Sequence, residues 1–430
     1  MNESGLPARI AAQDILSDVL RRRRPLDAAL DAVLSPGKLE PRDAGFARAI
    51  ASETLRRFGV LDGLLRTFIT KSPPQHRAGP TPEILLAGAC ELLFLDVAAH
   101  AAVDAANRLA ARDKKAVHFK PLINAALRRI DREGRAALAK LDGERLSVPD
   151  WLWPRWCETY GEDTTRAIAR AHALRPPLDI VCKDASFEIP GAIRMPNGGW
   201  RLADSGRVED LPGFADGAWW VQDFAATLPA HLLGDVRGKT VIDLCAAPGG
   251  KTAQLAAYGA NVIAVEREAS RMERLRSNLE RLKLPATLIE SDARDFTPDA
   301  PAPFVLLDAP CSATGTIRRH PDLPWIKSAS DINLCASGAG ELLDAAAEMV
   351  APGGTLVFAV CSLEPEEGLE QIAAFLDARK DFKRSPLAGS DVFGMREALT
   401  PDGDLRTLPS HLPEQGGMDG FYAARLKRSA

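Results

Sequence analysis

Five short apolar runs recur in the second half of this 430-residue chain. In order, they read KTVIDLCAA, ANVIAVE, ATLIE, PFVLLDAP and GGTLVFAVCS. Segments with helical spacing, such as REASRMERLRSNLERLKL, lie between them. Strands that alternate with helices in this way form a doubly wound α/β domain around a parallel sheet. We therefore predict such a domain over residues 236–430.

The first part of the chain has a different pattern. Residues 1–140 contain segments such as ARIAAQDILSDVL and TPEILLAGACELLFLD, whose apolar residues have helical spacing, so we predict an all-helical domain. Residues 141–235 combine short candidate strands such as LDIVCK with Gly/Pro turns, which indicates a small α+β connector. The connector also holds three tryptophans, for which packing between domains is favoured over stacking on bases: Trp151, Trp153 and Trp156.

Charge is distributed unevenly along the chain. Residues 1–140 carry 23 Lys and Arg against 16 Asp and Glu, whereas the remainder carries 31 against 42. The basic excess includes the run Arg21–Arg24. A basic module on an acidic body is typical of proteins with a polyanionic partner, although a solvated helix face explains it equally well.

Several classes of protein are disfavoured by composition. No apolar run approaches the ~20 residues of a membrane helix, and the N-terminus lacks a signal-peptide pattern, so we expect a cytoplasmic protein with no membrane partner. The seven cysteines form no CxxC pair. This spacing fits reduced thiols better than a disulfide framework or a zinc site, and no metal is expected.

The loop after the first predicted strand has the character of a ligand loop. It reads DLCAAPGGKT, and its small residues and two glycines allow a ligand to approach the backbone at the start of the next helix. It contains neither GxGxxG nor GxxxxGK[ST], which disfavours a nicotinamide or ATP enzyme.

Two acids follow at the ends of the next strands. Glu266 ends the second strand, where a carboxylate binds ribose hydroxyls, and Asp292 follows the third, near a possible adenine edge. Either acid alone is equally well an ordinary surface carboxylate. Together with the loop they indicate an adenosine-bearing cofactor, and the missing phosphate loop favours S-adenosylmethionine.

Two cysteines end the fourth and fifth strands. The fourth strand leads into Asp308 and Cys311, and the fifth leads into Cys361. A thiolate that adds to carbon 6 of a pyrimidine makes carbon 5 able to accept a methyl group, while an acid beside the ring balances charge at nitrogen 3. This chemistry requires the site to lower a cysteine pKa. From the residues alone, either cysteine is a candidate for the nucleophile.

At this point the sequence resembles the ribosomal RNA cytosine-5 methyltransferases of the RsmB (Fmu/Sun) type. The resemblance is carried by DLCAAPGGKT, DAPCSATGTIRRHPD, VCSLEPEEG and GGMDGFYAARL. The front segments GFARAIASETLRRFGVLDGLL and LLFLDVAAHAAVDAANRLA resemble the NusB-like RNA-binding domain of that family. The resemblance implies an all-α NusB-like domain, a small α+β connector and a Rossmann-like class I S-adenosylmethionine-dependent methyltransferase domain.

It also implies a role for each site residue. Cys361 is the expected nucleophile, Cys311 is expected to assist release of the methylated base, and Asp308 is expected to face both cofactor and cytosine. The remaining residues of the expected cofactor site are Cys245, Ala246, Ala247, Pro248, Gly249, Gly250, Lys251, Glu266 and Asp292. Glu266 stands where the family mostly has aspartate, and Val360 where it has threonine.

The implied activity is methylation of carbon 5 of a cytosine in 16S ribosomal RNA by a monomer that binds structured RNA. A transfer RNA cytosine-5 methyltransferase and a noncatalytic RNA-binding assembly factor are the alternatives, and a DNA cytosine methyltransferase would use Cys311 as its nucleophile. We expect the segment with Arg318, Arg319 and His320 to shape the RNA entrance, with the arginines near phosphates.

Overall fold

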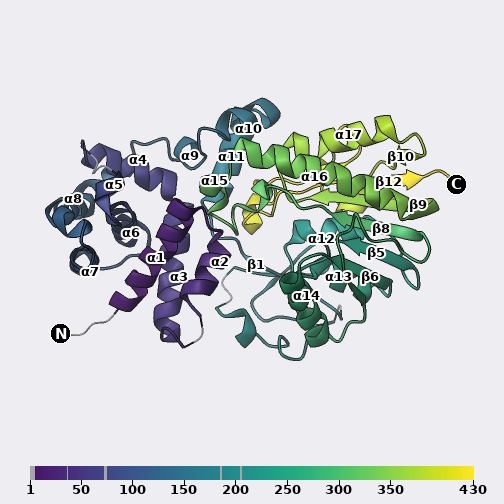
Figure 1. The fold of residues 1–430 in the computed structure, drawn as a ribbon, viewed down its shortest axis with the longest axis horizontal. Helices are drawn as coiled ribbons and strands as arrows, with labels where there is room; N and C mark the ends of the chain where they lie inside the picture. The colour runs from purple at the N-terminus through teal and green to yellow at the C-terminus, as the bar shows by residue number, and fades with distance from the viewer. Residues whose placement is uncertain (1–4, 36, 72–74, 185, 204–205) are drawn as a thin grey trace. The chain divides into compact units, whose positions relative to one another are not determined.

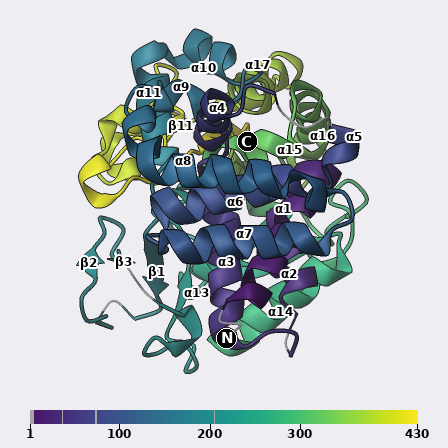
Figure 2. The same cartoon turned by 90° about the vertical axis from the view of Figure 1, so that its left-hand side faces the viewer.

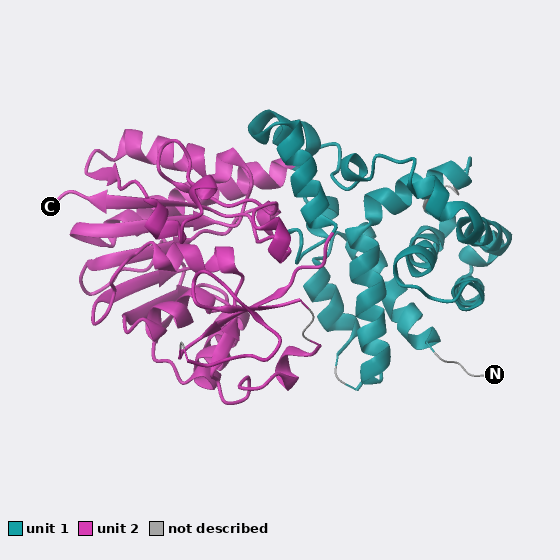
Figure 3. Cartoon of the chain, turned by 180° about the vertical axis from the view of Figure 1, so that it is seen from behind, with its two compact units in different colours: residues 1–173, 317–328 teal, residues 174–316, 329–430 magenta. Residues whose placement is uncertain are grey.

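The computed structural model describes residues 5–35, 37–71, 75–184, 186–203 and 206–430. The chain forms two compact units, shown in different colours in Figure 3. The helical unit comprises residues 1–173 and 317–328, and the catalytic-fold unit comprises residues 174–316 and 329–430. The expected connector is thus shared between them, with 141–173 in the first and 174–235 in the second. As independent domains, the three expected segments remain a prediction.

The described residues of the helical unit contain helices and no strand. Its elements are α1 (Leu6–Arg22), α2 (Leu26–Val33), α3 (Pro41–Arg56), α4 (Phe58–Phe68), α5 (Gln75–Ala78), α6 (Thr81–Phe94), α7 (Ala99–Arg112), η1 (Ala116–Phe119), α8 (Lys120–Leu138), α9 (Gly143–Leu146), α10 (Trp153–Tyr160), α11 (Glu162–His172) and α15 (Leu323–Ile326). Helix α6 is apolar on nearly all sides, and a helix of this kind must be covered all round. It packs against α7 and α8, which lie beside it in Figure 2.

The basic run near the N-terminus makes ion pairs inside the helical unit. Arg21 pairs with Glu83 of α6, and Asp18 accepts hydrogen bonds from both Arg22 and Arg24. These ion pairs neutralise part of the positive charge that the sequence pattern suggested for binding a polyanion. Any RNA contact from this unit must therefore draw on further basic side chains.

Residues 317–328 interrupt the sequence of the catalytic-fold unit and belong to the helical unit. The backbone N–H of Leu26 donates to Asp322 Oδ2 over 2.9 Å, and Trp325 Nε1 donates to the carbonyl of Leu55 over 3.0 Å. Trp151 Nε1 donates to the carbonyl of Pro324 over 3.2 Å. Arg318 is fully buried. The expectation that Arg318 lies near phosphates is therefore wrong, because its guanidinium has no exposed surface.

The three tryptophans, expected to pack between domains, make their contacts within the helical unit. Trp156 is buried against the ring of His172, and Trp153 lies under the guanidinium groups of Arg145 and Arg166. Trp151 is hydrogen-bonded to the carbonyl of Pro324, so each of the three indoles has a partner in its own unit.

The catalytic-fold unit contains a small sheet and a large one. The small antiparallel sheet has the order β2-β3-β1-β4, and the large one β10-β12-β9-β8-β5-β6-β7 with β11 paired to β12. The strands are β1 (Leu178–Cys182), β2 (Ile193–Arg194), β3 (Trp200–Leu202), β4 (Trp219–Val221), β5 (Thr240–Leu244), β6 (Asn261–Glu266), β7 (Thr287–Glu290), β8 (Ala302–Asp308), β9 (Val350–Val360), β10 (Phe382–Arg384), β11 (Leu405–Arg406) and β12 (Tyr422–Arg428). The helices are α12 (Phe224–His231), α13 (Gly250–Ala257), α14 (Ala269–Leu282), α16 (Ala329–Glu348) and α17 (Leu369–Ala378), with short turns η2 (Val208–Asp210), η3 (Thr314–Thr316), η4 (Pro365–Glu367), η5 (Gly389–Val392), η6 (Arg396–Ala398) and η7 (Pro413–Gln415).

Alternating side chains of the large sheet form two cores. Val241 and Leu306 pack on the side of α12, α13 and α14, whereas Ile242 and Leu307 pack on the side of α16 and α17. Figure 1 shows these two helix layers on opposite faces of the sheet. The five strands predicted from the apolar runs pair in parallel, from β9 across to β7.

The sheet is mixed rather than wholly parallel. β12 runs antiparallel to β9, and β10 runs antiparallel to β12. The strand order reverses between β5 and β8, and open α/β sheets bind ligands beyond the carboxyl ends of strands at such a point. The Rossmann-like prediction is confirmed with this antiparallel addition. Among the described residues, no helix combines the length and apolar character that crossing a bilayer requires.

Candidate active site

The loop after β5 is shaped by two residues with left-handed backbone. Cys245 has φ 59° and Gly249 has φ 103°. A Cβ on Gly249 would lie 2.4 Å from Leu275 Cδ1, so no side chain fits there. The loop therefore turns tightly into α13 beneath α14. It leaves open space beyond the carboxyl ends of the neighbouring strands.

A pocket of about 390 Å³ occupies that space. Its volume lies within the usual range for small-molecule sites. The lining residues are Cys245, Val265, Glu266, Arg267, Arg271, Ser291, Asp292, Ala293, Arg294, Pro310, Leu334, Cys335, Gly338 and Leu342. Of the expected cofactor residues, Cys245, Glu266 and Asp292 are in this lining, whereas residues 246–251 and Asp308 are not.

The two acids of the pocket differ in environment. Glu266 is buried, and its carboxylate accepts the backbone N–H of Glu268 over 3.1 Å. Asp292 is more accessible and accepts hydrogen bonds from Arg294, which lower the pKa of Asp292 to about 2. Asp292 is therefore ionised at neutral pH. Two acids facing an apolar wall fit an adenosine group, whose ribose offers hydroxyls and whose base offers an N–H edge.

The apolar wall comes from α16, and the sequence analysis did not assign it to the site. Leu334, Gly338 and Leu342 line the pocket at intervals of four residues, which places them on one helix face. Leu334 is 75% exposed. The four-residue spacing was visible in the sequence, but such a stripe more often packs in a core. Cys335 of the same helix also lines the pocket.

Asp243 lies beneath the β5 loop and is fully buried. Its Oδ2 accepts the hydroxyl of Thr252 over 2.6 Å, which ties β5 to the start of α13. Burial raises the pKa of Asp243 to about 7. Its Oδ1 finds no hydrogen-bond partner among the described residues, as suits a carboxyl that carries a proton.

A buried ion pair joins the β5 loop to the end of β8. Lys251 Nζ donates to Asp308 Oδ2 over 2.7 Å, and the ammonium lies 5.1 Å from the ring centroid of Phe421. Burial alone would lower the pKa of Lys251, but the attraction and hydrogen bond of Asp308 outweigh it, and Cys361 contributes in the same direction. The pKa of Lys251 is raised, so the ammonium stays charged.

Cys311 and Cys361 lie side by side. Their sulfurs are 3.4 Å apart, and Gly315 N–H donates to the carbonyl of Cys361 over 3.0 Å. The proximity follows from the sheet, because β8 and β9 are adjacent parallel strands with Asp308 opposite Ala359. The structure thus brings together Asp308, Lys251 and both thiols beyond the carboxyl ends of β5, β8 and β9.

The two cysteines do not share one electrostatic role. The hydrogen bond with Cys361, followed by burial, raises the pKa of Cys311 well above the ordinary thiol value. The expected lowering of a cysteine pKa therefore does not hold at Cys311. Cys311 therefore keeps its proton at neutral pH, and its sulfur shares a hydrogen bond with that of Cys361. Burial also raises the pKa of Cys245 to about 12, which leaves it an inert thiol.

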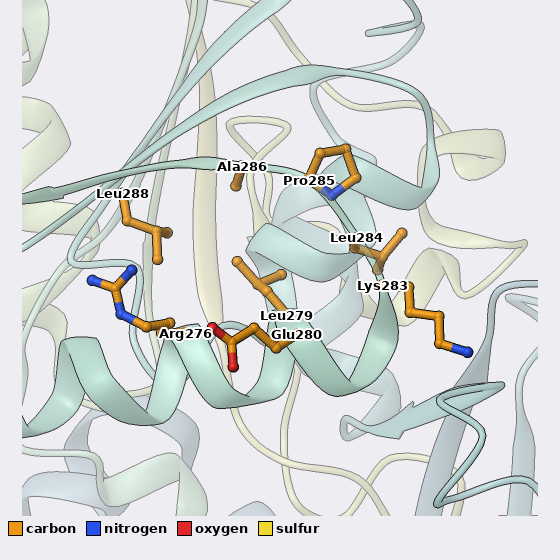
Figure 4. A pocket seen from close by; sticks show the side chains of 8 residues that line it. All are labelled: Arg276, Leu279, Glu280, Lys283, Leu284, Pro285, Ala286 and Leu288. Atoms are coloured by element: carbon orange, nitrogen blue, oxygen red, sulfur yellow. The ribbon is translucent and has the colours of Figure 1, made fainter.

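A wider hollow, of about 540 Å³, lies elsewhere on this unit (Figure 4). It is lined by Arg276, Leu279, Glu280, Lys283, Leu284, Pro285, Ala286 and Leu288 of α14 and the start of β7. None of the expected site residues lines it. Within the described part of the chain, no group of His, Cys, Asp and Glu is arranged to hold a metal ion.

The raised pKa of Asp243 predicts a pH-dependent stability. Because its folded pKa lies above its ordinary value of 3.8, its contribution is complete below that value and is lost as pH rises through about 7. Asp243→Asn cannot ionise. Urea unfolding from pH 4 to pH 8 should show wild type losing stability relative to the variant by about 1.4 kcal/mol per pH unit up to about pH 7, with the difference levelling off above it. A constant difference between the two proteins would contradict the assignment.

Comparison with known proteins places this geometry in a family. The model of the 16S rRNA methyltransferase RsmB/F family matches residues 230–427, and that of the NusB family matches residues 6–132. Ribosomal RNA small subunit methyltransferase B of Pseudomonas putida is 38% identical, over 98% of each chain. The protein of the same name from Pseudomonas syringae is 36% identical, over 98% of this chain and 97% of that one.

A solved structure shares the whole fold. The protein titled PH0851 superposes with a TM-score of 0.76 over 100% of both chains, at 23% identity. This likeness concerns architecture, and the sequence relatives carry the assignment. The chain belongs to the RsmB/F family of 16S rRNA methyltransferases and has a NusB-family domain in its N-terminal part.

Proposed function

We propose that this protein transfers a methyl group from S-adenosylmethionine to carbon 5 of a cytosine in 16S ribosomal RNA. The base is held covalently by Cys361 during the transfer. The observation that carries the proposal is the pair of thiols 3.4 Å apart, with the Lys251–Asp308 ion pair beside them. The family assignment supports the choice of RNA as substrate.

The residues of the pocket fit the cofactor. Glu266 would accept ribose hydroxyls and Asp292 an adenine N–H, while Leu334 and Leu342 would cover the base. S-adenosylmethionine, when bound, supplies an electrophilic methyl group. The β5 loop, from Cys245 to Lys251, would shape the other end of the site through its closely packed backbone.

Cys361 supplies the nucleophile. Its thiolate adds to carbon 6, so that a sulfur–carbon bond forms and carbon 5 becomes electron-rich. Charge then builds up at nitrogen 3, which takes a proton from solvent, and the Asp308 carboxylate, oriented by Lys251, would accept the resulting N–H. Once carbon 5 is methylated, a water molecule takes its remaining proton, the sulfur–carbon 6 bond breaks with its electron pair returning to Cys361 as thiolate, and nitrogen 3 gives its proton back to solvent. Cys311 would assist this release step.

The target base must leave its stack to reach these thiols. The helical unit would hold the surrounding RNA by phosphate and shape contacts, which position a substrate without reading its sequence. Helix α8 exposes Arg128, Arg129, Arg132 and Arg135, which are candidates for these contacts. The protein would act as a cytoplasmic monomer.

Replacing the nucleophile should abolish turnover. Cys361→Ala removes the only group proposed to bond carbon 6, so transfer of tritiated methyl to 16S ribosomal RNA should fall to background while cofactor binding is retained. Cys157→Ala, on α10, is the matched control and should be active. A Cys361→Ala protein with normal methylation rates would exclude this role. Label that appears in transfer RNA but not in 16S ribosomal RNA would point to the transfer RNA alternative.

Replacing the second thiol should trap the intermediate. Cys311→Ala leaves Cys361 able to add to the base but slows release, so a covalent RNA adduct should accumulate. A shifted band on a denaturing gel detects it, and Cys311→Ala/Cys361→Ala should show none. The release role fails if Cys311→Ala turns over normally without a shifted band.

Neutralising the buried acid of the pocket should weaken cofactor binding. Glu266→Gln loses a charged acceptor for ribose hydroxyls, which corresponds to about a tenfold rise in the dissociation constant of S-adenosylmethionine. Titration calorimetry measures this constant, and Glu268→Gln, an exposed neighbour, should leave it unchanged. Equal constants for Glu266→Gln and wild type would remove Glu266 from the cofactor site.

A further inference from the structure

Each of the two cysteines is followed by a buried serine. Ser312 and Ser362 are both fully buried, and their hydroxyl oxygens are 3.2 Å apart. Thr314 Oγ1 lies 3.3 Å from Ser362 Oγ. The two loops therefore touch twice in succession, through the sulfurs of one residue pair and through the hydroxyls of the next.

Glu367 of η4 lies at one end of these hydroxyls. It is fully buried, and both of its oxygens bind Ser312. Oε1 accepts the backbone N–H of Ser312 over 2.7 Å, and Oε2 accepts its hydroxyl over 2.6 Å. Ser312 is thus held by two hydrogen bonds to one carboxylate, immediately after Cys311 in the chain.

The hydroxyls of the two loops form one connected cluster with Glu367. Ser312 gives its hydroxyl proton to Glu367 Oε2, so its oxygen can accept a further hydrogen bond. Ser362 Oγ lies within hydrogen-bond distance of Ser312 and of Thr314, and it also hydrogen-bonds Glu367. Backbone N–H groups complete the cluster, because Leu363 donates to Thr314 Oγ1 over 2.9 Å and Glu364 donates to Ser362 Oγ over 3.0 Å.

We propose that Glu367 is a positioning residue for the methyl-transfer reaction. It holds both Ser312 and Ser362 by hydrogen bonds, and so fixes the spacing of the two neighbouring thiols. This inference rests on the proposed function, but it concerns a residue that touches neither the cofactor pocket nor the sulfurs through a hydrogen bond.

The location of Glu367 is energetically unfavourable unless its partners stay in place. Burial raises the pKa of Glu367, and the hydrogen bonds from Ser312 and Ser362 act against that rise. A buried carboxylate with two donors on one residue constrains that residue in position and orientation. Apolar packing at the same place would restrict Ser312 far less.

Thiol spacing can be measured without any RNA. The azo oxidant diamide takes two electrons and two protons from a thiol pair, forms the disulfide and is reduced to the hydrazine. Peptide mapping by mass spectrometry follows the Cys311–Cys361 bond over time. Glu367→Ala should form it at least about tenfold more slowly than wild type, as the loss of a buried hydrogen-bonded partner implies. Glu370→Ala, an exposed acid at the start of α17, should match wild type.

Kinetics separate positioning from a merely structural role. In Glu367→Ala, kcat for 16S ribosomal RNA should fall about tenfold or more, while KM and the S-adenosylmethionine dissociation constant stay within about twofold. Glu367→Gln still accepts the N–H of Ser312, but its amide N–H must donate to the Ser312 hydroxyl. This reverses the direction of the hydrogen bond that the hydroxyl makes in wild type. Its kcat should therefore lie between those of Glu367→Ala and wild type. Ser312→Ala keeps the backbone bond and should also be intermediate.

A double substitution tests whether Ser312 and Glu367 act through the contact between them. Ser312→Ala/Glu367→Ala should be no slower than Glu367→Ala alone, since both remove the same contact. Unchanged disulfide rates in folded Glu367→Ala, or in Glu367→Gln and Ser312→Ala if Glu367→Ala does not fold, would overturn the positioning role. So would a loss confined to KM. Wild type that fails to methylate RNA, with disulfide rates as expected, would overturn the proposed function and leave the positioning intact.

Discussion

The parallel pairing of β8 with β9 is the constraint on which the site depends. Each strand ends in a cysteine-bearing loop, and adjacent parallel strands deliver such loops to the same edge of the sheet. With Asp308 opposite Ala359, the two cysteines leave the sheet at nearly the same level. The strand order also places β5 next to β8, so the loop with Lys251 reaches Asp308. Backbone pairing therefore sets the geometry of the reactive groups before any side-chain contact is considered.

Side chains of the same type differ in protonation because their electrostatic surroundings differ. Asp292 is ionised because Arg294 binds it, whereas buried Asp243 holds its proton near neutral pH. Cys311 and Cys245 keep theirs as well. Near the thiols, Lys251 is kept charged by Asp308.

Features that depend on the local sequence pattern were predicted, whereas features that depend on contacts between distant residues were missed. The apolar runs located all five parallel strands, and the loops at their ends located Cys311, Cys361, Glu266 and Asp292. The α16 wall was missed, because Leu334, Gly338 and Leu342 have the spacing of an ordinary core stripe. β12 was missed as a strand because its motif was used only as a family signature. Arg318 was expected at an RNA entrance. Its burial was missed because the residues that contact its segment lie hundreds of positions earlier in the sequence.

The insertion of residues 317–328 into the helical unit has a consequence for how the protein is made. During synthesis the chain emerges from its N-terminus, so α1 to α11 are available long before α15. Until then the N–H of Leu26 and the carbonyl of Leu55 lack the partners they have in the finished molecule. The ribosome must pass β5, β6, β7 and β8 before that gap is filled. The first unit to begin folding is thus among the last to be completed, and its maturation is tied to translation of the loop that carries Cys311.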